Sequence, residues 1–189
     1  MLDAIYAAVG QLHKPVFDTK YSGDQAITRA TFAEAKNSSK LTVIFPPWHV
    51  PSRFTTQLER RLVRQGSNVL VYNFNPLILE RDIIKVKNSF EYIALAVSED
   101  IATLVARKHI QTIDLLSLSL GGIALCVAAE KLPHFDSVTM VCTGNDLAAA
   151  FWAGWRTRRL RNIIKNEGYK LTDLQKEWAD LAPKATSKS

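Results

Sequence analysis

A serine flanked by small residues lies near the middle of the chain, in the stretch 117–121 (Ser-Leu-Ser-Leu-Gly). The residues at 112–116 before it and at 122–129 after it are mostly apolar. This pattern predicts a buried strand that stops at a serine, turns sharply and continues as a helix. A turn of this kind, a nucleophile elbow, points a serine hydroxyl out of the sheet, where it can attack the carbonyl carbon of an acyl compound.

Two serines in this stretch compete for the position at the turn. The turn is so tight that the residues two before and two after the nucleophile must be small. Around Ser119 these residues are Ser117 and Gly121, and both are small. Around Ser117 one of them is Leu115, which is too large. Ser119 is therefore the candidate nucleophile.

A serine hydroxyl near neutral pH needs a neighbouring base to remove its proton. The chain has four histidines, His13, His49, His109 and His134. The last two lie in loops that lead from a predicted helix into a predicted strand, at the sheet edge opposite the serine. His49 follows a predicted strand at 41–45 and therefore lies on the same edge as the serine. It is a candidate base, although lining a pocket or contacting a neighbouring segment is the more usual role for such a histidine.

Asp146 is the candidate acid, because it follows the predicted strand at 138–141 on the same edge of the sheet. The competing interpretation, which we favour, is a residue that caps the next helix. The two cysteines, Cys126 and Cys142, lie in apolar surroundings and are expected to be free buried thiols. Neither their spacing nor that of the histidines predicts a metal site, and no cofactor is implied.

Strand and helix patterns alternate along most of the chain. Strands are predicted at 26–35, 41–45, 68–74, 113–116 and 138–141, and helices at 86–107 and 121–132. This alternation predicts an α/β fold with a doubly wound, mostly parallel sheet that helices cover on both faces.

The chain divides by pattern into four parts. Residues 1–25 are expected to form an N-terminal lead of helix and loop, and residues 26–146 the core of the sheet and its helices. Residues 147–182 contain short helical patterns without a further strand. Residues 183–189 form a polar tail that is expected to be disordered.

The formal net charge of +6 is concentrated at the C-terminal side. Residues 151–189 contain nine Lys or Arg and four acids, so the first 150 residues are close to neutral. A basic stretch with tryptophans can contact RNA or acidic lipid, but a solvated helix face is the simpler interpretation and is preferred. The N-terminus lacks the pattern of a signal peptide, and no apolar run is long enough to cross a bilayer. We therefore expect a cytoplasmic protein without nucleic-acid or membrane partners.

Over residues 26–182 the order of elements resembles the N-terminal two thirds of an α/β-hydrolase, with the stretch 117–122 as a variant of its G-x-S-x-G motif. The resemblance implies a serine hydrolase acting on an ester, thioester or similar small acyl compound. It places oxyanion donors at the backbone N–H groups of Leu120 and Trp48. Pro47 departs from the glycine common in the second donor's loop. Residues 147–182 resemble the start of a helical cap, with Trp152 and Trp155 in its wall.

The same resemblance places an acid and then a histidine after the nucleophile, and no histidine occupies such a place in this sequence. Three expectations follow: a truncated hydrolase with little activity alone, one part of a split enzyme completed by a second chain, or a non-catalytic ligand- or protein-binding module. A fourth interpretation is a flavodoxin-like fold that holds a phosphate at residues 117–122.

Overall fold

The computed structural model describes residues 14–21, 25–48, 53–75, 78–144 and 146–182. Its strands are β1 (Lys14–Tyr21), β2 (Gln25–Ala33), β3 (Lys40–Phe45), β4 (Asn68–Phe74), β5 (Thr112–Leu118) and β6 (Ser137–Val141). Its helices are α2 (Arg53–Arg64), α3 (Ile83–Lys108), α4 (Gly121–Ala129), α5 (Leu147–Ala153), α6 (Arg158–Asn166) and α7 (Leu171–Glu177), and a 3₁₀ turn, η2 (Ala179–Leu181), follows.

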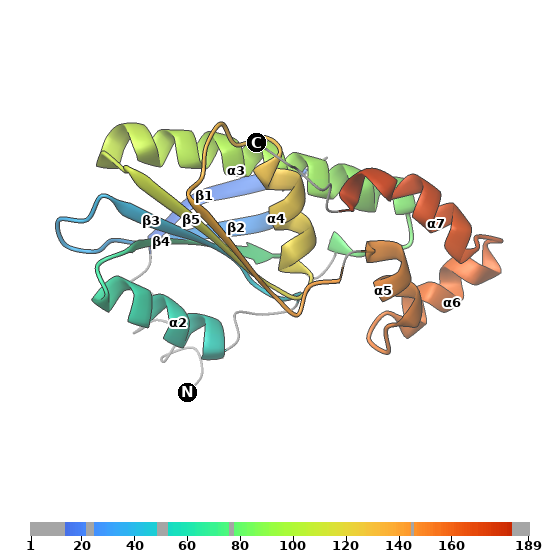
Figure 1. Cartoon of the computed structure of the whole chain (residues 1–189). Helices are drawn as coiled ribbons and strands as arrows, with labels where there is room; N and C mark the ends of the chain where they lie inside the picture. Colours follow the sequence, from blue (N-terminus) through green and yellow to red (C-terminus); the bar gives the residue numbers. More distant parts are fainter. Residues whose placement is uncertain (1–13, 22–24, 49–52, 76–77, 145, 183–189) are drawn as a thin grey trace.

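The six described strands form one sheet in the order β1-β2-β4-β3-β5-β6 (Figure 1). The pairs β4–β3, β3–β5 and β5–β6 are parallel, whereas β1–β2 and β2–β4 are antiparallel. The predicted α/β class with a mostly parallel sheet is confirmed. Because β3, β5 and β6 are parallel neighbours, the residues that follow them meet at one edge of the sheet.

The expected N-terminal lead is wrong in part, because residues 14–21 form strand β1. This strand pairs with β2 in a register that shifts between Pro15 and Phe17. Proline is tolerated in an edge strand and at a bulge, where its missing N–H leaves no ladder partner unsatisfied. The proline therefore marks the start of an edge strand. The remaining part of the lead and the tail at 183–189 lie outside the described residues.

Helices cover both faces of the sheet, α3 and α4 on one and α2 on the other (Figure 1). Strand β5 shows how one strand serves both faces. Ile113 and Leu115 are buried in the large core with α3 and α4. Leu116 and Leu118 pack instead on the smaller core beside α2. Side chains that alternate between faces thus fix the direction in which the residue after the strand points.

The segment α5–α7 lies beyond the carboxyl ends of the parallel strands (Figure 1) and shares the large core. Trp178 is 2% exposed and donates its indole N–H to the carbonyl of Ile83 at 2.8 Å. Its ring meets Phe151 edge to face, with centroids 5.5 Å apart. Lys87 of α3 forms an ion pair with Asp180 at 3.2 Å. These contacts anchor the three helices to α3.

A buried acid in α3 makes stability depend on pH. Tyr72 donates its hydroxyl hydrogen to Asp100 Oδ2 at 2.9 Å. Burial raises the pKa of Asp100 to about 6, although the hydrogen bond from Tyr72 acts in the opposite direction. An aspartate in an unfolded chain has a pKa of about 3.9. The folded state therefore binds this proton more tightly, so the contribution of Asp100 to stability is fully present below about pH 4 and is lost as the pH rises through 6.

Asp100→Asn is expected to remove this loss, because an amide oxygen still accepts the Tyr72 hydrogen bond without carrying a charge. At pH 8 the variant should be more stable than the wild type by roughly 2 kcal/mol, with little advantage at pH 4. Urea unfolding at the two pH values measures this, with Glu167→Gln, which replaces an exposed acid at the end of α6, as the control. A difference between variant and wild type that does not change with pH would contradict the assignment.

Candidate active site

Ser119 lies on the predicted turn between β5 and α4 and is exposed. Its φ is 52°, in the left-handed region that residues with a side chain rarely adopt. The strain costs about 1–2 kcal/mol and needs support from the surrounding structure. Part of that support is a hydrogen bond from the N–H of Ser119 to the carbonyl of Val141, 2.9 Å long, which ties the turn to the end of β6.

The two glycines after the serine are required by close packing. A Cβ at Gly121 would lie 2.1 Å from the carbonyl oxygen of Phe45, at the end of β3. At Gly122 it would lie 2.0 Å from the Cγ2 of Thr143, just after β6. The start of α4 is therefore packed tightly between the end of β3 and the segment after β6, the two strands that flank β5. Ser117, two residues before the turn, is fully buried, so its small size is also required.

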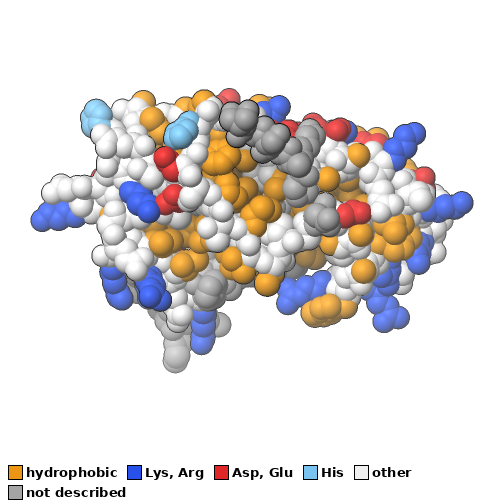
Figure 2. Space-filling model, viewed as in Figure 1, with side chains coloured by type: hydrophobic (Ala, Val, Ile, Leu, Met, Phe, Trp, Pro, Cys, Tyr) orange, Lys and Arg blue, Asp and Glu red, His pale blue; other side chains and the backbone are white. Residues whose placement is uncertain are grey.

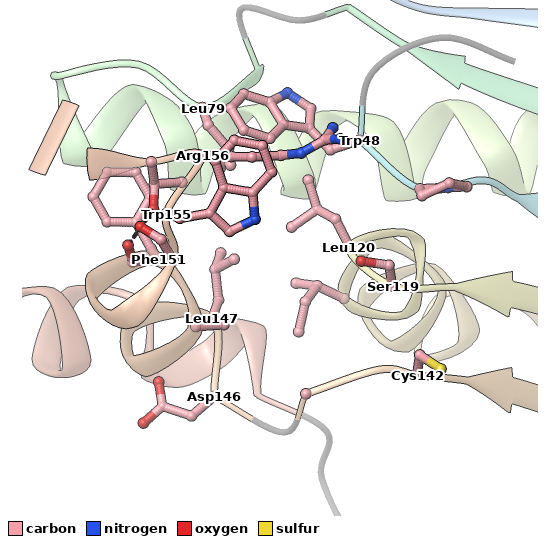
Figure 3. A pocket seen from close by; sticks show the side chains of 16 residues that line it. Trp48, Leu79, Ser119, Leu120, Cys142, Asp146, Leu147, Phe151, Trp155 and Arg156 are labelled. Atoms are coloured by element: carbon pink, nitrogen blue, oxygen red, sulfur yellow. Dashed lines mark hydrogen bonds between the residues drawn. The ribbon is translucent and has the colours of Figure 1, made fainter. Parts of the chain in front are cut away.

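A cavity of about 550 Å³ opens in front of the serine (Figure 3). Most of its lining is apolar. Its described wall comes from the β3–α2 and β4–α3 connections, the start of α4, the segment after β6, and α5 with the residues after it. Its main apolar side chains are Trp48, Leu79, Leu120, Ile123, Leu147 and Phe151. A hollow of this size and composition suits a small, mostly apolar ligand.

The structure brings both expected oxyanion donors to this cavity, since Leu120 and Trp48 line it. Leu120 precedes α4 with helical dihedral angles, and no described residue accepts its N–H. Pro46 and Pro47 have no N–H, so Trp48 carries the first backbone donor after β3. The carbonyl groups of Phe45 and Pro46 lie close to Gly121, so this loop passes directly beside the turn.

Comparison with solved structures finds similar folds. A candidate carboxylesterase from Lactobacillus plantarum has a TM-score of 0.55 and 13% identity over 86% of this chain and 72% of its own. An esterase from Pyrococcus furiosus has 0.54 and 11% over 88% and 62%. The acylaminoacyl peptidase of Pyrococcus horikoshii has 0.57 and 11% over 94% and 31%. The fold is that of the α/β-hydrolases.

The chain spans from 31% to 72% of the length of these three proteins. No protein-family model matches its sequence, and no curated protein does either. The α/β-hydrolase fold excludes the flavodoxin-like interpretation. Within the described residues, no cluster of three metal-binding side chains exists, and none of the helices could cross a membrane.

Within this α/β-hydrolase fold, Asp146 lines the cavity, but its carboxylate is already engaged. One oxygen accepts the backbone N–H of Ala149 at 2.9 Å, which caps α5, and the other accepts the side-chain amide of Gln175 at 2.9 Å. These bonds, the backbone one first, hold the pKa of Asp146 below its usual value. The arrangement fits the helix-capping interpretation rather than an acid that orients a base.

The histidines give no base among the described residues of the cavity. His109 ends α3, and His134 precedes β6 with its Nε2 3.4 Å from Asp136 Oδ1. Both therefore lie where helices lead into strands, as expected, and neither lines the cavity. His49 and His13 are outside the described residues. His49 as base stays a prediction.

The two tryptophans differ in position. Trp155 lines the cavity and is 79% exposed. Trp152 is not among the lining residues, so its expected place in the wall is wrong; its ring instead packs under Lys165, with Nζ 5.0 Å from the centroid. The helical period of α5 explains the position of Trp152, whereas Trp155 follows the helix. Positions 147, 150, 151 and 154 share the face toward the cavity, and residue 152 is turned away from it.

Sequence reasoning missed three polar residues of the cavity, Cys142, Arg156 and Thr157. Cys142 was expected to be buried, but it is exposed because β6 is the last described strand of the sheet. Cys126 is half-buried, and burial raises the pKa of its thiol. Arg156 belonged to a basic stretch assigned to solvent. The one sequence signal for Arg156 is the helical spacing of the cavity-facing positions in α5, because this spacing leads to the connection that carries Arg156.

Proposed function

We propose that the chain is a serine hydrolase-like protein whose cavity binds an ester, thioester or similar acyl compound and whose Ser119 is the nucleophile. The observation that carries this proposal is the exposed serine at a φ of 52° on a strand–turn–helix junction. Its hydroxyl lines an apolar cavity together with Leu120, whose N–H has no described acceptor. The esterases with similar folds support the choice of acyl chemistry.

In the proposed reaction, Ser119 Oγ attacks the carbonyl carbon, and the carbonyl oxygen becomes an oxyanion. The N–H groups of Leu120 and Trp48 donate to that oxyanion. As the carbonyl reforms, the leaving group departs as an alcohol or thiol with the proton that the base took from Ser119. Water then removes the acyl group from the serine as a carboxylic acid. The proton of Ser119 needs an acceptor, and His49, which follows β3, is the candidate within this chain.

The second part of the proposal is that this chain alone turns over slowly. No described histidine or carboxylate pairs with Ser119, and Asp146 is occupied in capping α5. The oxyanion donors and binding alone still give a modest rate enhancement. A second chain that completes the sheet would supply the missing groups.

The outer edge of the sheet supports pairing with such a chain. All five residues of β6 are exposed, and three of them are large and apolar, Val138, Met140 and Val141. Figure 2 shows apolar side chains gathered over the middle of the face that this strand crosses. Unpaired edge strands without charged residues are ready to accept another strand.

A non-catalytic binding module is the second candidate function. It is favoured by the same absence of a described base beside Ser119, combined with an apolar cavity that needs no chemistry to hold a ligand. The two functions differ in one property, the reactivity of the serine hydroxyl.

That reactivity is measured by treating the purified chain with a fluorophosphonate and detecting the adduct by intact mass. Ser119→Gly is the negative control, because it removes the hydroxyl and because glycine adopts a positive φ without steric strain. Ser98→Ala serves as the matched control at a remote serine on α3. We expect a single adduct in the wild type and in Ser98→Ala and none in Ser119→Gly.

His49→Ala is expected to slow the labelling at least tenfold if His49 is the base. Labelling that survives in Ser119→Gly would reject Ser119 as the nucleophile. A wild type that is folded and stays unlabelled would reject an active serine in this chain alone and would leave a binding module or one part of a split enzyme.

A further inference from the structure

The described lining of the cavity contains one acidic and one basic side chain, Asp146 and Arg156. The carboxylate of Asp146 is held by Ala149 and Gln175, as described above. Arg156 is exposed and forms no ion pair with any described acid. Asp146 keeps its negative charge, but its hydrogen bonds hold it at the start of α5, so Arg156 is the one cation among the described lining residues that can receive an anion.

An aromatic ring supports this guanidinium. Its Cζ lies 5.1 Å from the centroid of the Trp155 ring, within the range of a cation–π contact. Figure 3 shows Arg156 beside the indoles of Trp48 and Trp155, on the far side of the cavity from Asp146 in this view. A guanidinium held by a ring keeps its N–H groups available for a planar anion.

The surrounding segment strengthens the positive field. Residues 151–166 contain five Arg or Lys and no acid. Two of these cations have local partners, since Arg161 donates to the carbonyl of Trp152 and Lys165 lies over the ring of the same residue. Lys and Arg side chains surround the part of the molecule where α6 lies (Figure 2). Arg156 is the member of this group that reaches the cavity.

We propose that the cavity selects acyl compounds that carry an anionic group, a carboxylate or a phosphate, and that Arg156 binds this group while the apolar lining holds the hydrocarbon. The proposal rests on the proposed function and names the substrate class of that site. Arginine forms paired hydrogen bonds with both anions, which adds geometric selectivity to the attraction of charge.

Binding of unreactive ligands tests the proposal without turnover. The probes are decanoate, decyl phosphate and decanol, which share one chain and differ in the head group. Calorimetric titration of the wild type should show at least one of the two anions binding ten times more tightly than decanol. A preference for only one of the anions identifies which of the two groups the site takes. Equal affinity for all three probes would overturn the proposal.

The variants locate the preference. Arg156→Gln should reduce anion affinity at least tenfold and leave decanol affinity within a factor of two. Arg156→Lys should keep part of the preference, because the charge remains and the paired geometry is lost. Arg159→Gln removes the same charge from an exposed position outside the cavity and should change anion affinity less than threefold. An equal loss in the two Gln variants would show that a diffuse basic surface, and not Arg156, attracts the anions.

The two proposals fail separately. If fluorophosphonate labelling fails while the anion preference holds, the chain is a binding module for anionic acyl compounds. If labelling succeeds and the preference is absent, the hydrolase stands and the assignment of Arg156 is wrong.

Discussion

Gly121→Ala is expected to unfold the chain or to lower its unfolding free energy by more than about 3 kcal/mol. The new methyl group would lie 2.1 Å from the carbonyl oxygen of Phe45 and 2.6 Å from that of Pro46. Both obstacles are backbone atoms, and Phe45 is also fixed by the ladder between β3 and β5. No side-chain rotation relieves the clash, so either α4 or the end of β3 must move.

Gly122→Ala is the informative comparison, because its methyl group meets a side chain instead. The nearest atoms belong to Thr143, with Cγ2 at 2.0 Å. Thr143→Gly removes these atoms and should restore at least 1 kcal/mol to Gly122→Ala, a coupling of the size found between residues in contact. The same change should restore nothing to Gly121→Ala.

Urea unfolding followed by circular dichroism measures these differences. Gly144→Ala is the matched control, since the nearest atom to its methyl group is the Ala150 Cβ, at 3.9 Å. It should stay within about 0.5 kcal/mol of the wild type. A stable, soluble Gly121→Ala variant would show that the loop after β3 does not press on the turn, and the proposed place of the Trp48 donor would fall with it.

The position of the turn was predictable because local rules decide it. A buried strand, a serine and two glycines in this order are compatible with few structures other than this turn. The small size of Ser117, two residues before Ser119, favoured Ser119 as the residue at the turn. The reason for the glycines was not predictable. It lies in Phe45 and Thr143, which only the sheet order brings to the turn.

The errors share a physical origin as well. Strand β1 was missed because an edge strand with an early proline has a weak pattern. Cys142 was expected to be buried because its neighbours are apolar, although β6 is an edge and its side chains are exposed. Trp152 and Trp155 were placed together because they are close in sequence, but Trp152 lies in α5 and Trp155 on the connection after it, which borders the cavity. In each case the sequence pattern reflects only residues that are close along the chain, whereas the exposure of a side chain depends on residues that the fold brings near it.

Trp178→Ala is expected to lower the unfolding free energy by about 3–5 kcal/mol, the usual cost of removing a buried aromatic ring. The substitution opens a hole against Phe151 and leaves the buried carbonyl of Ile83 without its donor. Trp178→Phe keeps most of the ring and loses only the N–H, so about 1–2 kcal/mol should be lost. Trp155→Ala removes the same ring from a position that is 79% exposed and should cost less than about 0.5 kcal/mol.

The same variants test whether α5–α7 is part of one cooperative unit with the sheet. Phe151, which packs on Trp178, also lines the cavity, so the anchor of these helices and the wall of the site are the same contact. We therefore expect Trp178→Phe to fold but to bind decanoate several times more weakly, and its unfolding to remain a single transition. Two separate transitions would show that residues 147–182 fold independently. In that case the cavity would be an interface between two units, and Arg156 would act from a part of the chain that moves relative to Ser119.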